Sequence, residues 1–120
     1  MDTDKVTEKI ISCGIKVSNA LGAGFLEKVY ENALLLELRK TGLKLEQQKR
    51  ISVTYENTVV GDYIADLVIN DEIIVEVKAL NGIDGSHHAQ LLNYLKATGI
   101  RVGLILNFGT SRMGIKRMVL

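Results

Sequence analysis

The sequence predicts a single α/β domain in which a mixed sheet is flanked by helices. Apolar residues recur at helical spacing through the first 40 residues, whereas short alternating or continuous apolar stretches, typical of strands, follow from residue 44. A further helical pattern then separates the third strand from the fourth. A meander followed by such a helical crossover produces a mixed sheet with helices packed against it.

Length and composition limit the alternatives. A chain of 120 residues suits one domain, and 47% apolar with 24% charged residues is typical of a folded globular protein rather than a disordered one. A net charge of +1 does not by itself indicate a nucleic-acid partner. The single cysteine, Cys13, excludes an internal disulfide and is interpreted as a packing residue. No stretch resembles a signal peptide or a membrane span, so we expect a cytoplasmic protein with no membrane partner.

The pattern predicts the following elements in order. Helices are expected at 3–21, 26–40 and 86–98, with Thr3 and Ser86 as the caps of the first and third. Strands are expected at 44–56, 59–69, 73–79 and 101–107, with an additional edge strand at 114–120. The mostly apolar segment 101–107 predicts a strand that is covered on both faces.

Three charged residues, Asp66, Glu76 and Lys78, interrupt the apolar segment DYIADLVINDEIIVEVK at 62–78. A two-residue hairpin loop would place the two carboxylates on opposite faces of the sheet. A three-residue loop at 70–72 puts Asp66 opposite Glu76, with Lys78 on the same face, and leaves the other face apolar. The second register buries less charge and is therefore predicted. It pairs Ile69 with Ile73, Leu67 with Val75, Ala65 with Val77 and Tyr63 with Ala79.

Two carboxylates on adjacent strands form a suitable oxygen site for Mg²⁺. A metal ion there polarises a phosphoryl oxygen and lowers the pKa of a bound water. Lys78 would orient or deprotonate that water or stabilise developing negative charge. These residue types therefore indicate phosphodiester hydrolysis. The alternative is that Asp66, Glu76 and Lys78 form a solvated sheet face with an ordinary ion pair.

Asp66, Glu76 and Lys78 resemble the motif of the PD-(D/E)XK nuclease superfamily, in which an Asp ends one strand and E-x-K lies on the next. Ala65 occupies the position of the leading proline, which varies in that superfamily. The resemblance implies a restriction-endonuclease-like core and a nuclease that uses Mg²⁺, with Mn²⁺ as a substitute. It also implies a nucleic-acid substrate, with DNA favoured over RNA.

The segment GFLEKVY at 24–30 is similar to the signature of the GxxExxY proteins within that superfamily. Glu27 and Tyr30 lie one helical turn apart and share a face. The resemblance implies that Glu27 supplies a third metal-binding carboxylate and that Tyr30 lies near the cleft. Taken alone, an acidic residue at the start of a helix is also typical of a favourable dipole partner.

The segment HHAQLLNYL at 87–95 resembles the Q-x-x-x-Y motif of RecB-like nucleases. This resemblance implies that Gln90 binds a catalytic water or a phosphate and that Tyr94 contacts the substrate. The spacing alone says only that both share a helical face, and without the resemblance it favours a packing role for both residues. His87, three residues before Gln90, is predicted to lie near the same cleft, and His88 on the surface.

Two further hypotheses belong to other functional classes. In the first, the chain is a non-catalytic nucleic-acid-binding or protein-interaction module that retains the nuclease fold. In the second, it is a structural or interaction protein that forms a homo-oligomer through the edge of the 114–120 strand. Two Phe and four Tyr give little support to an aromatic platform for single strands. The sequence does not show whether the following basic residues cluster: Lys44, Lys49, Arg50, Lys96, Arg101, Arg112, Lys116 and Arg117.

Overall fold

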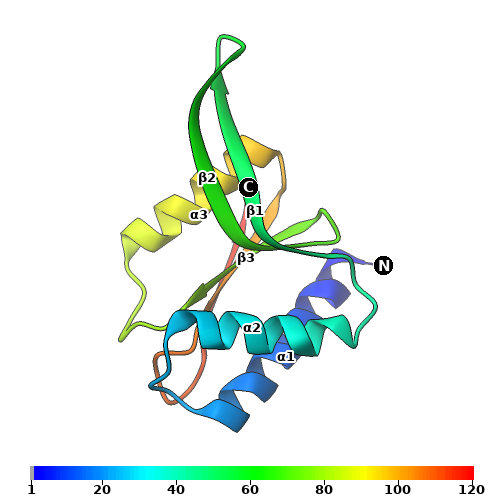
Figure 1. Cartoon of the computed structure of the whole chain (residues 1–120), viewed down its shortest axis with the longest axis vertical. Coiled ribbons are helices and arrows are strands. Elements are labelled where there is room, and N and C mark those ends of the chain that lie inside the picture. The colour runs from blue at the N-terminus through cyan, green and yellow to red at the C-terminus, as the bar shows by residue number, and fades with distance from the viewer. Residues whose placement is uncertain (1) are drawn as a thin grey trace.

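The predicted mixed α/β architecture is confirmed by a computed structural model that describes residues 2–120 (Figure 1). Its elements follow the predicted order. The helices are α1 (Thr3–Leu21), α2 (Glu27–Arg39) and α3 (Gly85–Thr98). The strands are β1 (Leu45–Tyr55), β2 (Thr58–Ile69), β3 (Ile73–Lys78), β4 (Val102–Asn107) and β5 (Gly114–Val119).

One sheet has the strand order β1-β2-β3-β4-β5. Neighbouring strands are antiparallel except β3 and β4, which α3 connects and which run parallel. All residues of β4 are buried, which confirms that this strand is covered on both faces. The segment after residue 114 does form the predicted edge strand, β5.

The helices cover opposite faces of the sheet. The first face carries α1 and α2, whose buried residues, such as Ile10 and Leu34, pack with Leu67, Val75 and others from the strands. The second face carries α3, where Leu91, Tyr94 and Leu95 join a smaller cluster of strand residues. The long β1–β2 hairpin extends beyond both layers as an arm, with α3 beside its base (Figure 1).

The predicted register of β2 and β3 is confirmed where the two strands are paired. Leu67 lies opposite Val75, and a three-residue loop at 70–72 joins the strands. The pairing stops there. The predicted partnerships of Ala65 with Val77 and of Tyr63 with Ala79 are wrong, because the β2–β3 ladder ends at Leu67 and Val75 and β2 continues with β1 alone.

The side chains of β2 change faces at Asp66. Leu67 faces the α1–α2 layer, whereas Ala65 packs in the α3 cluster and the Tyr63 ring contacts Tyr94 of α3. Simple alternation, which places Tyr63, Ala65 and Leu67 on one face, is therefore wrong beyond residue 66. Opposite Asp66, Gln48 of β1 has a φ of 54°, so both strands are irregular at this level.

Two predicted caps and one turn are corrected. Asp2 caps α1, with its side chain accepting a hydrogen bond from the Asp4 amide. Asp84, not Ser86, caps α3. The β1–β2 turn is formed by Glu56 and Asn57 rather than by residues 57 and 58. Both turn residues have positive φ, as a two-residue hairpin turn that matches strand twist requires.

The helices of residues 2–120 differ from membrane-spanning helices. None combines the length and the apolar character that a membrane span requires.

Candidate active site

Asp66 and Glu76 clasp the two strands together at the point where the ladder ends. The Asp66 backbone N–H donates to Glu76 Oε2 at 2.8 Å, and the Val77 N–H donates to Asp66 Oδ2 at 2.8 Å. Each carboxylate thus occupies a backbone donor of the opposite strand in place of a carbonyl. This arrangement fixes both carboxyl groups and satisfies amides that the departing strand would otherwise leave unpaired.

Glu76 is buried, and Asp66 is half-buried beside it. Glu76 is only 3% exposed, and its burial, reinforced by the negative charge of Asp66, raises its pKa to about 8. Burial also raises the pKa of Asp66, while the hydrogen bond from Val77 opposes the increase. Carboxylates on a solvated sheet face would be exposed and would have ordinary pKa values, so the burial of Glu76 contradicts that alternative.

Lys78 lies two residues beyond Glu76, at the end of β3. Its ammonium contacts Gln90 Oε1 of α3 at 3.3 Å, and within residues 2–120 it forms no direct ion pair with a carboxylate. Its charge nevertheless lowers the pKa values of Asp66, Glu76 and Glu27. A lysine near several carboxylates but not paired with one retains N–H donors for another oxygen ligand.

The backbone around Lys78 is fixed by β4. The Phe108 N–H donates to the Lys78 carbonyl at 2.8 Å. Asn107 is 2% exposed, and its side chain accepts from the Leu80 N–H at 2.9 Å and donates to the Leu80 carbonyl at 3.0 Å. A Cβ at Gly109 would lie 2.2 Å from that same carbonyl, so glycine is needed for this close approach. Asn107 was not predicted as a supporting residue.

Glu27 lies in the first turn of α2 and is influenced by the same charges. Partial burial raises its pKa, which Lys78 lowers and Asp66 raises. It does not complete a ligand set in this conformation. Among residues 2–120, no three His, Cys, Asp or Glu side chains lie close enough to hold one metal ion. The predicted role of Glu27 as a direct third ligand therefore has no support in the geometry, whereas its electrostatic proximity does.

Glu31, one turn further along α2, was not predicted and lies deeper than Glu27. It is 1% exposed and accepts hydrogen bonds from Lys28 Nζ at 3.1 Å and from Gln47 and Gln48 Nε2 at 2.7 and 2.9 Å. Neighbouring strand residues normally point to opposite faces, and the positive φ of Gln48 explains how both amides reach one carboxylate. Gln48 Nε2 also lies 3.5 Å from Asp66 Oδ1, so Glu31 helps to position the Gln48 side chain beside Asp66. The i, i+4 spacing from Glu27 was the available signal.

Tyr30 is fully buried and has a structural role. Its hydroxyl donates to the Gly22 carbonyl at 2.5 Å and accepts from the Phe25 N–H at 3.1 Å. Its ring stacks on Phe108 with centroids 4.9 Å apart. Tyr30 thus holds the loop that precedes Glu27 against the segment that follows β4, and it lies in the core rather than on a cleft wall.

The predicted residues of α3 divide into two groups. Gln90 contacts Lys78, and Tyr94 lies near the carboxylates, since burial, followed by the charges of Glu76 and Asp66, raises its pKa. His87 Nδ1 instead accepts from the Asp84 N–H at 3.1 Å in the capping box of α3. His87 is therefore engaged at the helix start and does not contact Asp66, Glu76 or Lys78 through any described hydrogen bond.

A comparison with known protein families gives one match. The sequence model of the PD-(D/E)XK nuclease superfamily matches residues 4–118. The chain belongs to this superfamily. No curated protein and no solved structure is significantly similar to it. Within the superfamily, the narrower resemblance to GxxExxY proteins rests on Gly24, Glu27 and Tyr30 and stays a prediction.

PD-(D/E)XK nucleases generally use divalent metals, and the carboxylates of this member suit a hard cation. Asp66 Oδ1 has only the long contact with Gln48, and Glu76 Oε1 accepts no described hydrogen bond. No buried side-chain oxygen in the described part of the chain lacks a partner, so Glu76 Oε1 reaches solvent. Each carboxyl group therefore keeps one oxygen for a ligand while the other holds the opposite strand.

Several of the basic residues that the sequence offers for phosphate binding form ion pairs with nearby carboxylates. Lys44 pairs with Asp71, Lys49 with Glu46, and Arg50 with Asp62. Arg117 pairs with Asp4 at 2.7 Å. They do not form one uniform phosphate-binding surface. Lys96 on α3 has no ion-pair partner among residues 2–120.

Proposed function

We propose that this chain is a metal-dependent nuclease that hydrolyses phosphodiester bonds in nucleic acid, with DNA favoured over RNA. The observation that carries the proposal is the opposition of Asp66 to the buried Glu76, with Lys78 two residues beyond Glu76 on the same strand. Superfamily membership supports the same reaction class.

In this proposal Asp66 Oδ1 and Glu76 Oε1 hold Mg²⁺, or Mn²⁺ in its place. A bound divalent cation supplies polarisation of the phosphoryl oxygen and a lowered pKa for a coordinated water. Its charge also favours the ionised form of Glu76, whose pKa is otherwise raised by burial. The clasp to the backbone keeps both carboxyl groups oriented, so little reorganisation is needed when a cation binds.

The roles of the other residues follow from their positions. Lys78 donates to a phosphate oxygen on which negative charge develops and thereby stabilises the transition state. Gln90 restrains that ammonium through the 3.3 Å contact. Glu27 acts electrostatically or through a water. Glu31 positions Gln48 beside Asp66, and Tyr30 holds the loop that precedes Glu27.

The experiment compares cleavage of single-stranded and duplex DNA and RNA with Mg²⁺ or Mn²⁺, and with EDTA. The substitutions Glu76→Gln and Lys78→Met should each lower the cleavage rate about 10²- to 10³-fold, the usual effect of removing one transition-state-stabilising group. Lys116→Met, on the exposed strand β5, is the matched control and should retain activity. Equal activity in wild type and both site variants would sink the assignment.

The non-catalytic module predicts a different result. In that case no cleavage occurs with any substrate, calorimetry detects no Mg²⁺ or Mn²⁺ binding, and nucleic acid binds in a salt-sensitive manner. The raised pKa of Glu76 favours this second candidate, because a protonated carboxyl group binds no metal.

A further inference from the structure

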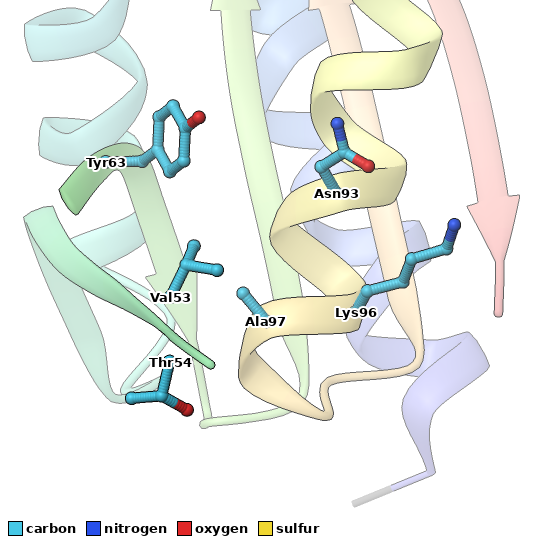
Figure 2. Close-up of a pocket in the computed structure, with 6 residues that line it drawn as sticks. All are labelled: Val53, Thr54, Tyr63, Asn93, Lys96 and Ala97. Atoms are coloured by element: carbon cyan, nitrogen blue, oxygen red, sulfur yellow. The ribbon is translucent and has the colours of Figure 1, made fainter. Parts of the chain in front are cut away.

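A groove separates the β1–β2 arm from α3. It has a volume of about 450 Å³ and is lined by Val53, Thr54 and Tyr63 from the arm and by Asn93, Lys96 and Ala97 from α3. Figure 2 shows these two sets on opposite walls, with Val53 and Ala97 directed toward one another across the gap. This volume is within the range of ordinary ligand sites.

One groove residue, Tyr63, packs beside Tyr94, which lies near the candidate active site. The rings of Tyr63 and Tyr94 have centroids 5.7 Å apart and are tilted by 46°. Tyr94 is 4% exposed and within the electrostatic reach of Glu76 and Asp66, whereas Tyr63 is 50% exposed. Tyr94 therefore lies near both the carboxylates and the exposed ring of Tyr63.

The lining matches the two halves of a nucleotide. The Tyr63 ring, Val53 and Ala97 provide apolar surface, and Thr54 and Asn93 provide polar groups that can hydrogen-bond a base edge. Lys96 stands at the rim with its ammonium directed outward from the arm (Figure 2). No ion pair with a carboxylate of residues 2–120 restrains this ammonium, so the flexible Lys96 side chain can turn toward the phosphate of a strand whose base lies in the groove.

We propose that this groove binds an unpaired nucleotide adjacent to the scissile phosphate, with its base against Tyr63 and its backbone along Lys96. The substrate is then a single strand or a single-stranded end. A base inside a duplex exposes only its edges, whereas an unstacked base offers a face to an aromatic side chain. This inference rests on the proposed function for the position of the cleaved bond.

The test measures binding of a fluorescein-labelled single-stranded oligonucleotide and of its duplex by anisotropy, in a Glu76→Gln background that prevents cleavage. Adding Tyr63→Ala should weaken single-strand binding about 5- to 100-fold, the usual cost of losing one base-stacking ring. Tyr63→Phe should retain affinity. Tyr55→Ala, on the same arm but 68% exposed and outside the groove, is the matched control and should change little. Lys96→Gln should weaken binding and reduce the salt slope by about 0.7.

Each outcome separates this inference from the proposed function. If wild type cleaves with Mg²⁺ but Tyr63→Ala binds single strands as tightly as its parent, or the duplex binds as well as the single strand, the groove inference alone fails. If binding depends on Tyr63 while no metal-dependent cleavage occurs, the groove stands and the nuclease assignment fails. Equal losses from Tyr55→Ala and Tyr63→Ala would overturn the groove, because the effect would then belong to the arm as a whole.

Discussion

The β2–β3 pair is built differently at its two ends. At the closed end, Leu67 faces Val75 and Ile69 faces Ile73 in a regular ladder, and these side chains are fully buried. At the open end, the carboxylates of Asp66 and Glu76 take the place of ladder carbonyls. The closed end has apolar side chains and complete backbone pairing, as a stable core requires. The open end holds ionisable groups where β2 departs toward the arm.

This difference shows how a sheet can accommodate buried acids. The strands separate, so side-chain oxygens can bind backbone donors without displacing an existing pair. The separation also admits residues from both helical layers, since α2 contributes Glu27 and α3 contributes Gln90. The strand divergence that ends the regular ladder is therefore what assembles the candidate site.

The largest expected effect is the pH dependence of the open end. In metal-free protein, the folded-state pKa of Glu76 is raised to about 8 from its ordinary value of 4.5. The folded state therefore keeps a proton that the unfolded state releases between these values. The resulting stability is fully present below about pH 4.5 and is lost as the pH rises through about 8, by on the order of 5 kcal/mol. Urea unfolding in EDTA at pH 5 to 9 measures it.

Two glutamine substitutions sharpen that measurement. Glu76→Gln should remove most of the pH dependence and exceed wild type in stability above pH 8. A smaller dependence of the same sign should remain, because the pKa of Asp66 is also raised. Glu72→Gln changes a carboxylate in the neighbouring loop and should keep the wild-type profile. An unchanged slope in Glu76→Gln would show that its carboxyl group is not the titrating one.

The closed end should respond to packing rather than to pH. Leu67→Ala removes a fully buried side chain and should lower the free energy of unfolding by about 3 kcal/mol. The loss should be the same with and without Mn²⁺. Val60→Ala on the same strand changes a 61% exposed side chain and should have almost no effect. A loss in Leu67→Ala that disappeared when metal was added would contradict the separation of the two ends.

The closed end could be predicted from the sequence because its information is local. Alternating burial and the cost of placing a carboxylate in the apolar face were enough to select the three-residue loop and the pairing of Leu67 with Val75 and of Ile69 with Ile73. Asn70 and Asp71 both take positive φ in that loop, which such residues tolerate. The helices, the parallel β3–β4 pair and the edge strand followed from periodicity in the same way.

The open end could be predicted only in part because its remaining features are not local. The change of face at Asp66 depends on where the arm departs and on the positive φ of Gln48. The burial of Glu31 depends on two amides of β1 that pattern analysis treats as exposed strand residues. The number of aromatic residues also did not predict the aromatic pair, because the pair depends on the contact between Tyr63 and Tyr94 in the folded chain.

The smallest expected effect concerns metal binding, which separates the ends most selectively. At about 100 times its dissociation constant, Mn²⁺ should stabilise the folded chain by about 2.7 kcal/mol. Asp66→Asn should abolish this increase, because the amide can still accept from Val77 N–H but carries no charge. Asp62→Asn alters an exposed carboxylate on the same strand and should leave the increase intact.

Proton release provides a second readout of the same site. At pH 7 the folded chain holds the Glu76 proton, so metal binding must displace it, and about one proton should leave per ion bound. Calorimetry in buffers of different ionisation enthalpy counts that proton. Metal binding without proton release would mean that the ion does not bind Glu76. The proposed metal site at the open end would then be wrong.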